Sequence, residues 1–372
     1  MQKIYNHFIT GATGILGSEY LAQILEQFPN DNIWLLVKAD DQDQAESKIS
    51  HLLSYLYPNE QKQKDFFYRI KVLNGDLAQD KMGLSDLNWN QLVDKTDYIV
   101  HAASITDCSQ SSATINQVNI EGTRRVLDFA KVITPKQLKK IIYISSAYVN
   151  DKNQGLLFPE QMETKEGKLS PYQRSKYNAE KMIRDNFYQL PLIIVRPSYI
   201  VGNSENGRVP KQNSFHKLLQ EIVYGDKIKL PIDKAANWDI ITSDWAAKMM
   251  VSLLKSRARA GQNYHLTMGD YALSSKMVKT EIHNALNAQN FSFNPIKLLP
   301  SWQHWWHRIF AKKSLQNNHP ALLKTMRYKR VFDNSSSLMT CHKSKIDTPK
   351  LKNYLPKIIS YAQTHFWCDK VN

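Results

Sequence analysis

A tyrosine and a lysine four residues apart, Tyr172 and Lys176, have the residue types and spacing of a proton-transfer pair. Ser170 and Pro171 stand immediately before them, which predicts a helix that begins at the proline with the serine as its cap. Residues four apart share one face of a helix, so both side chains would point the same way. A lysine ammonium near the phenol favours phenolate, which predicts a lowered pKa for Tyr172 and proton exchange near neutral pH.

Two serines, Ser145 and Ser146, stand at the end of a buried strand predicted over residues 140–145. Either hydroxyl could hydrogen-bond a substrate oxygen, although the first serine could simply end the strand. A carbonyl group held between Ser146 and Tyr172 would be polarised for attack by a hydride. A Tyr-x-x-x-Lys pattern alone usually marks a solvent-facing pair, so the catalytic interpretation depends on the whole group of residues.

A glycine-rich turn near the start of the chain has the pattern of a pyrophosphate site. Gly11, Gly14 and Gly17 lie between a strand predicted over residues 4–10 and an amphipathic helix predicted over residues 15–28. The three glycines would allow a tight exit from the strand, close approach of amides to phosphate, and close packing of the helix on the sheet. Glycine triplets also occur in plain turns, but the strand before and the helix after favour a dinucleotide site.

The residue that ends the second predicted strand, over residues 32–37, normally meets the adenosine ribose of a dinucleotide. An acidic residue there would repel a 2′-phosphate, whereas Lys38 could pair with it. The sequence therefore favours NADP(H), with NAD(H) and a merely solvated lysine as alternatives. Asp76, after the third strand, could accept a hydrogen bond from adenine or could be a turn residue.

The remaining strands and helices alternate without long gaps, which predicts an α/β fold: a Rossmann-type doubly wound parallel sheet with its ligand at the carboxyl ends of the strands. Ala102, at the end of the fourth strand, is small enough for a cofactor to lie against it, and His101 is expected to be a packed structural residue. The strands are predicted over residues 70–73, 98–102, 140–145, 192–195 and 264–266, and the helices over residues 42–56, 111–130 and 246–254.

The domain organisation follows from this alternation and from where it stops. Residues 1–201 are expected to form the NAD(P)-binding domain, with residues 238–262 returning to it. Residues 202–237 and 263–372 are expected to form a smaller C-terminal substrate-binding region. Asp244 is expected to cap the helix that follows it rather than to act as an acid.

The composition narrows the class of protein. The 372 residues carry a net charge of +15, which could favour an anionic small molecule, an acidic carrier protein, nucleic acid or an anionic membrane surface. No nucleic-acid-binding module is recognisable. Cys108, Cys341 and Cys368 are far apart and odd in number, which predicts neither disulfides nor a metal site and favours a cytoplasmic location. No secretory signal or membrane-spanning apolar run is found.

Residues 298–330 combine tryptophans with many basic residues. Trp302, Trp305, Trp306 and Phe310 fall on one side of a predicted helix. This segment could rest peripherally on an anionic membrane, frame an acyl pocket and its phosphate-bearing handle, or simply cover the substrate region; the last interpretation is favoured.

Together these motifs resemble the extended short-chain dehydrogenases/reductases. A narrower resemblance is to the branch of fatty acyl-CoA reductases, the "male sterility" NAD-binding domain, and the thioester reductase domains of carboxylic acid reductases and peptide synthetases. That branch usually carries an arginine where this chain has Lys38 and often a threonine where it has Ser146. The broader resemblance is carried by residues 10–17, 75–77, 101–103, 119–123, 145–149, 172–176 and 196–198, and the narrower one by residues 35–39, 75–77, 83–85, 89 and 145–150.

The resemblance implies roles for individual residues. Ser146, Tyr172 and Lys176 would be catalytic, and Asn119 would tie neighbouring segments together. It implies cofactor contacts from Gly11, Thr13, Gly14, Ile15, Lys38, Asp76, Leu77 and Pro197, to which the residue-level arguments add Gly17, Ala102 and Lys176.

The activity that the resemblance implies is an NADPH-dependent reduction of an acyl thioester, on coenzyme A or a carrier protein, or of a fatty aldehyde. Collapse of a hemithioacetal would release the thiol and an aldehyde; chain length, final product and oligomeric state stay open. An NAD-dependent nucleotide-sugar epimerase or dehydratase is the alternative, against which Lys38 and residues 83–85 argue. A non-catalytic dinucleotide-binding regulator is a third possibility, but such a protein tends to lack the tyrosine and lysine.

Overall fold

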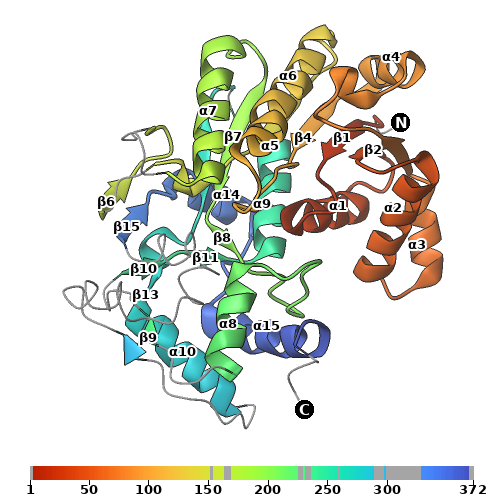
Figure 1. Cartoon of the computed structure of the whole chain (residues 1–372). Helices are drawn as coiled ribbons and strands as arrows, with labels where there is room; N and C mark the ends of the chain where they lie inside the picture. The colour runs from red at the N-terminus through yellow and green to blue at the C-terminus, as the bar shows by residue number, and fades with distance from the viewer. Residues whose placement is uncertain are drawn as a thin grey trace.

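The computed structural model (Figure 1) describes residues 3–150, 154–162, 169–224, 229–230, 236–258, 260–288, 297–298 and 328–367. At its centre lies a seven-stranded sheet in the order β12-β7-β5-β4-β1-β2-β3, in which every neighbouring pair is parallel. The predicted Rossmann-type doubly wound fold is confirmed. Its strands are β1 (Asn6–Thr10), β2 (Asn32–Val37), β3 (Ile70–Asn74), β4 (Tyr98–His101), β5 (Lys140–Ile144), β7 (Leu192–Pro197) and β12 (Asn263–Leu266).

Helices cover both faces of this sheet, which is why its strands are almost continuously apolar. Ile9 packs in the cluster beneath α1 and α9, whereas its neighbour Phe8 packs in the cluster beneath α6 and α7, because successive side chains of a strand point to opposite faces. The covering helices and short helical turns are α1 (Ile15–Gln27), α2 (Gln42–Leu56), α3 (Glu60–Phe67), η1 (Asp80–Gly83), α4 (Asp86–Lys95), α6 (Gly122–Val132), α7 (Pro171–Asn186) and α9 (Ser243–Lys255).

One predicted helix, over residues 111–130, is three elements in the structure. α5 (Ser112–Asn116) continues into a π-helical turn, η2 (Gln117–Glu121), and only then into α6. Such π-turns are rare and occur frequently at functional sites. This one carries Asn119, which is fully buried.

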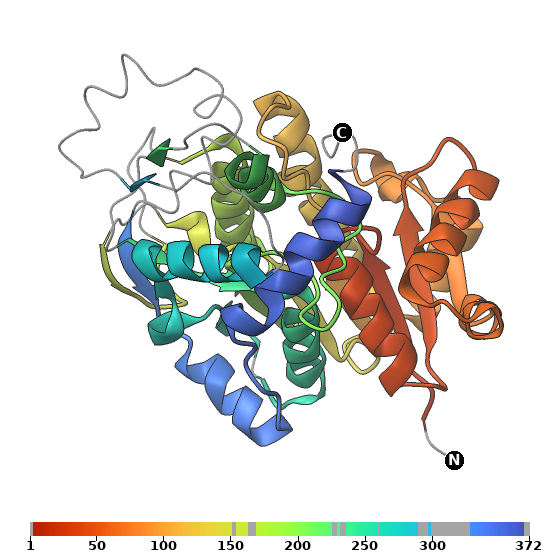
Figure 2. The same cartoon turned by 90° about the horizontal axis from the view of Figure 1, so that it is seen from below.

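A second, smaller core lies beyond the sheet. α8 (Ser214–Tyr224), α10 (Ser275–Ala288) and α15 (Leu351–His365) pack around Trp238 and Ile240, and Figure 2 shows α10 beside α15. The remaining elements of the described chain are η3 (Ala147–Val149), β6 (Gln154–Leu157), β8 (Tyr199–Ile200), β9 (Lys229–Leu230), β10 (Asn237–Trp238), β11 (Ile240–Ile241), η4 (Gly269–Tyr271), β13 (Leu273–Ser274), β14 (Lys297–Leu298), β15 (Lys329–Phe332) and α14 (Ser335–Ser344).

The expected cap at Asp244 is wrong. Helix α9 begins at Ser243 with Thr242 in the capping position. The Asp244 carboxylate instead accepts hydrogen bonds from the backbone N–H and the hydroxyl of Ser204, at 2.8 and 2.7 Å, because that loop folds back over the start of the helix.

Two other expectations concern membranes. The Trp-rich stretch of residues 298–330 lies outside the described residues, apart from its ends. No helix in the described part of the chain is both long enough and apolar enough to cross a bilayer.

Candidate active site

The start of helix α7 is locked in place by its own sequence. The Ser170 hydroxyl accepts a hydrogen bond from the Gln173 backbone N–H at 3.3 Å, and the Gln173 side chain accepts one from the Ser170 N–H at 3.0 Å. Pro171 occupies the first helical position, where its missing N–H costs nothing. The predicted cap is confirmed, and Tyr172 therefore sits in a rigid first turn, one turn before Lys176.

The two candidate serines have different partners. The Ser145 hydroxyl donates to the Glu180 carboxylate on α7. That carboxylate also receives both Nε and Nη2 of Arg196, at 2.9 and 2.6 Å, and both members of this ion pair are buried. The Ser146 hydroxyl accepts from the Tyr148 backbone N–H at 3.1 Å, which leaves its own proton available for a substrate oxygen. Ser146 is thus the better candidate for polarising a carbonyl.

Lys176 is buried, and its Nζ donates to the Ile144 carbonyl at 2.7 Å. The same Nζ lies 4.9 Å from the centre of the Tyr143 ring. Burial lowers the pKa of Lys176 to about 7, although the Glu180 carboxylate one turn further along α7 partly opposes this shift. A group in this environment changes charge near neutral pH, where proton transfer is most useful.

The phenol of Tyr172 does not have the lowered pKa that the sequence analysis predicts. Burial raises the pKa of Tyr172 well above its ordinary value, with a smaller contribution from the Cys108 thiol. The expectation is wrong for this structure because removal from water disfavours phenolate, and because Lys176 is directed at the Ile144 carbonyl. The phenol is therefore held protonated, as a proton donor must be before the reaction.

The glycine-rich turn is packed as closely as a dinucleotide site requires. Gly11 has a φ of 77°, and a Cβ atom there would lie 2.4 Å from the Ala103 backbone nitrogen. A Cβ atom on Gly17 would lie 2.0 Å from the Gly11 carbonyl oxygen. Gly14 occupies the capping position of α1, so the helix N-terminus opens directly onto the turn. The residues present therefore fit a pyrophosphate.

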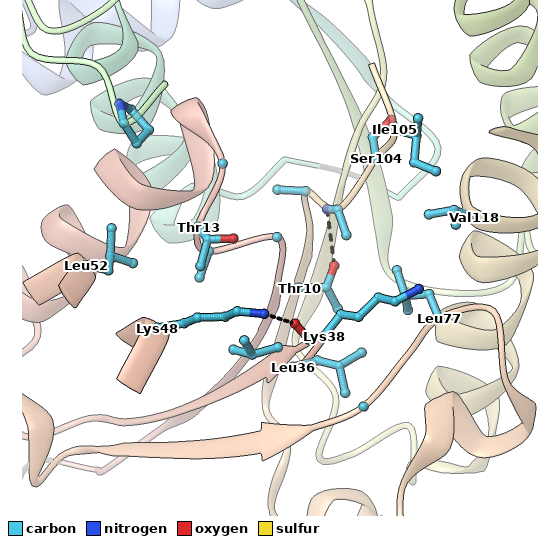
Figure 3. A pocket seen from close by; sticks show the side chains of 18 of the residues that line it. Thr10, Thr13, Leu36, Lys38, Lys48, Leu52, Leu77, Ser104, Ile105 and Val118 are labelled. Atoms are coloured by element: carbon cyan, nitrogen blue, oxygen red, sulfur yellow. Dashed lines mark hydrogen bonds between the residues drawn. The ribbon is translucent and has the colours of Figure 1, made fainter. Parts of the chain in front are cut away.

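A cavity of about 680 Å³ opens at this turn (Figure 3). Seven of the predicted cofactor residues line it, and the other four predicted cofactor residues, with Ser146 and Tyr172, lie outside its lining. The seven are Gly11, Thr13, Gly14, Lys38, Asp76, Leu77 and Ala102, and the four are Ile15, Gly17, Lys176 and Pro197. The cavity thus accounts for the adenosine and pyrophosphate half of the predicted site.

Lys38 has a partner that the sequence did not indicate. Its Nζ lies 2.8 Å from Oδ2 of Asp76, and its side chain is 74% exposed. Burial alone would raise the pKa of Asp76, but hydrogen bonds from Lys38 and from the Ala78 N–H outweigh it and hold this pKa below its ordinary value. Lys48, on α2, donates to the Lys38 carbonyl at 2.8 Å (Figure 3).

Two further residues turn out to hold the framework together. His101 is buried with its ring nitrogens 2.7 Å from the Thr10 hydroxyl and 2.9 Å from the Thr123 hydroxyl, and burial, with the charge of Lys176, lowers the pKa of His101 to about 3. It is a neutral structural residue. Asn119 bonds both the N–H and the carbonyl of Ile105 and donates to the Ser175 hydroxyl, which ties the loop after β4 to α7.

Residues 9–250 match the family described as male sterility protein. The chain belongs to this family. Membership places it among the NAD(P)-dependent oxidoreductases of the extended short-chain dehydrogenase/reductase type, as the sequence analysis predicts.

The relatives in this family are longer than the chain. It is 29% identical over 263 residues to the L-2-aminoadipate reductase of Saccharomyces cerevisiae, covering 64% of this chain and 19% of that protein. It is 26% identical over 329 residues to a Drosophila melanogaster protein named as a candidate fatty acyl-CoA reductase, covering 79% of this chain and 56% of that protein. The chain therefore spans about half, or less, of these relatives.

Solved structures share the fold. The terminal R domain of the myxalamid biosynthetic pathway superposes with a TM-score of 0.81 at 21% identity, covering 99% of this chain and 93% of that domain. A UDP-glucuronic acid 4-epimerase of Bacillus cereus superposes less well, with a TM-score of 0.66 at 17% identity, covering 96% of this chain and 99% of the epimerase. At these identities the likeness concerns the fold.

Among the residues that line the cavity, four on α2 and Lys211 were not predicted from the sequence. Lys48, His51, Leu52 and Tyr55 of α2 all line the cavity. They recur at helical spacing, and that signal could have found them once α2 was known to face the cavity. Lys211 also lines the cavity, and no local pattern marks it.

Proposed function

We propose that this member of the male sterility family is an NADPH-dependent reductase of an acyl thioester, on coenzyme A or an acyl-carrier protein, or of a fatty aldehyde. The observation that carries the proposal is that the two serines after β5 have different hydrogen-bond partners. Ser145 is committed to Glu180, which leaves Ser146 beside the helix that presents Tyr172 and Lys176. The names of the relatives, a reductase in each case and in one case of a fatty acyl-CoA, support a thioester as substrate.

The residues around the cavity would hold the cofactor. Gly11, Thr13 and Gly14 would contact the pyrophosphate at the N-terminus of α1. Lys38 and Lys48 supply positive charge where β2 ends, which favours a 2′-phosphate and hence NADPH. When bound, the reduced nicotinamide supplies the hydride.

The chain's own residues would handle the substrate oxygen and its proton. The Ser146 hydroxyl donates a hydrogen bond to the carbonyl oxygen, and the Tyr172 hydroxyl donates its proton to the same oxygen as the carbonyl carbon is reduced. The Lys176 ammonium, held by the Ile144 carbonyl one helical turn from Tyr172, would supply the positive charge of the site while the phenol is deprotonated.

A thioester needs one further step. As the C–S bond of the hemithioacetal breaks, Tyr172 takes the proton back from the hydroxyl, the aldehyde forms, and the thiolate leaves and is protonated by solvent. A fatty aldehyde would need only the first step and would give the alcohol. The same residues therefore serve either substrate.

The test is NADPH consumption by the purified protein, with a long-chain acyl-CoA and the matching aldehyde assayed in parallel. We expect Tyr172→Phe to lower kcat at least about 100-fold, the usual contribution of a positioned acid. Tyr177→Phe, which removes a phenol from the same helix, is the matched control and should keep its activity.

The other outcomes are also informative. Full turnover by the Tyr172→Phe variant would contradict the proposal. Consumption with the aldehyde alone would limit the protein to carbonyl reduction. No consumption with either substrate, together with NAD retained through purification, would point to a nucleotide sugar instead.

A further inference from the structure

The cavity at the glycine-rich turn is lined in part by a segment from the other half of the chain. Pro210 and Lys211 line it together with residues of α2, although this stretch was expected to belong to the substrate-binding region. We call residues 203–213 the strap. In Figures 1 and 2 this loop, which precedes α8, lies between α1 and α15.

The strap is fastened to the Rossmann domain by Arg208. Its Nε and Nη2 lie 2.9 and 3.3 Å from the two carboxylate oxygens of Glu19 on α1, and its Nη1 donates to the Leu56 carbonyl at 2.8 Å, where α2 ends. The side chain of Asn203 donates to the same Glu19 carboxylate at 3.1 Å. Glu19 is buried, and forked arginine–carboxylate pairs of this kind fix geometry as well as charge.

The opposite side of the strap rests on α15. Gly207 has a φ of 75°, and a Cβ atom there would lie 2.2 Å from the Lys357 carbonyl oxygen, so only glycine fits this contact. The Lys357 ammonium donates to the Ser204 carbonyl at 3.2 Å. At its far end the strap is held by Asn213, whose side chain donates to the Ile200 carbonyl at 2.9 Å. The strap is therefore seated between the two cores.

The strap adds a positive charge, that of Lys211, to the lining of the cavity. Asp76 is the one acidic residue in the described lining, and it is already paired with Lys38. Lys48 donates to a backbone carbonyl, and neither Lys48 nor Lys211 pairs with a carboxylate among the described residues. Two ammonium groups from different segments of the lining, one from α2 and one from the strap, thus remain available to an anion.

We propose that the strap closes the adenosine end of the dinucleotide site and that Lys211 pairs with the 2′-phosphate of NADP(H). This inference rests on the proposed function for the identity of the dinucleotide. It makes the second half of the chain part of the cofactor site, so that the dinucleotide contacts a loop that α15 supports directly.

Calorimetric binding of 2′-phospho-ADP-ribose and of ADP-ribose tests the inference without turnover. We expect Lys211→Gln to weaken the first ligand about tenfold, which is 1.4 kcal/mol, and to leave the second within about twofold. Lys343→Gln on α14, an exposed lysine away from the cavity, removes the same charge and should change neither.

The two proposals fail differently. If the unmodified protein prefers 2′-phospho-ADP-ribose but Lys211→Gln keeps that preference, the strap has no role in the preference and the NADPH proposal stands. If the unmodified protein binds both ligands equally, the NADPH preference and the role of Lys211 both fall. An equal loss for both ligands would overturn the assignment to the 2′-phosphate.

Hydrogen exchange provides a second readout. We expect amides of residues 203–213 to exchange more slowly with 2′-phospho-ADP-ribose bound than with no ligand, and we expect Lys211→Gln to lose most of this protection. Unchanged exchange in the strap of the unmodified protein at saturating ligand would overturn the closure.

Discussion

At the scale of single residues, burial shifts the pKa of both members of the proposed proton-transfer pair. Tyr172 is held as a neutral phenol, and Lys176 is held close to the point where it loses its proton. The spacing of the two residues in the sequence does not predict these pKa shifts, because their main cause is the removal of both side chains from water and not the interaction of one with the other. Burial of the Lys176 ammonium therefore lowers the free energy of unfolding by an amount that can be measured.

Lys176→Met should stabilise the protein most at low pH. In the unfolded chain a lysine stays charged up to about pH 10.4, whereas the folded protein favours the neutral amine down to about pH 7. Lys176 therefore lowers stability fully below pH 7, and this penalty shrinks as the pH rises towards 10. The variant's melting temperature should rise by about 1 °C for each kcal/mol recovered, because the entropy of unfolding grows with chain length, and activity should be lost.

Lys181→Met, an exposed change on the same helix, is the matched control for these melting curves. A difference between Lys176→Met and the unmodified protein that stays constant from pH 6 to pH 10, or that grows with pH, would contradict the depressed pKa of Lys176.

At the scale of elements, the decisive arrangement is a clamp between α7, β5 and β7. Glu180 lies one turn beyond Lys176 and binds Arg196 on β7 and Ser145 after β5. The Lys176 ammonium adds a bond to the last residue of β5. These contacts set the position of Tyr172 relative to Ser146, so a change in the clamp should act on both folding and catalysis.

Glu180→Gln should lower the free energy of unfolding by about 3–5 kcal/mol, because it leaves the Arg196 guanidinium buried without its counter-charge. Ser145→Ala removes only a hydroxyl from the same clamp and should cost about 1 kcal/mol with most activity kept. Urea unfolding of both variants measures the difference. Equal costs would show that the buried charge pair is not the main contribution of the clamp.

At the scale of the whole molecule, the two halves of the chain are interleaved. Helix α9, from the second half, packs against α1 in the core beneath the glycine-rich turn, and β12 completes the sheet beside β7. The strap then reaches from the second half back to α1 and α2. The cofactor site is therefore built on contacts between segments far apart in the sequence.

Trp245→Ala should unfold both halves together. Trp245, on α9, is almost completely buried in the core that it shares with α1, so its removal should cost about 3–5 kcal/mol. We expect one transition, at the same denaturant concentration by tryptophan fluorescence and by far-ultraviolet circular dichroism. Trp89→Ala, at a half-buried position on α4, should cost less. Two separated transitions in the Trp245 variant would mean that the cores are independent.

The features that the sequence determined by itself are those governed by neighbours along the chain. The cap at Ser170 depends on Gln173, three residues away, and the turn at Gly11 depends on backbone freedom that glycine alone provides. The alternation of apolar strands and amphipathic helices predicted the parallel, doubly wound sheet in the same way, because strands that are covered by helices on both faces are apolar almost throughout.

The features that only the tertiary structure decided involve partners far apart in the chain. Which serine is available was decided by Glu180, and the helix expected over residues 111–130 contains a π-turn where Asn119 bonds the loop at Ile105. The presence of Lys211 in the cofactor cavity depends on Arg208 reaching Glu19. Burial and pairing of this kind depend on which helices, strands and loops pack against one another. The spacing of residues along the chain does not indicate these long-range contacts.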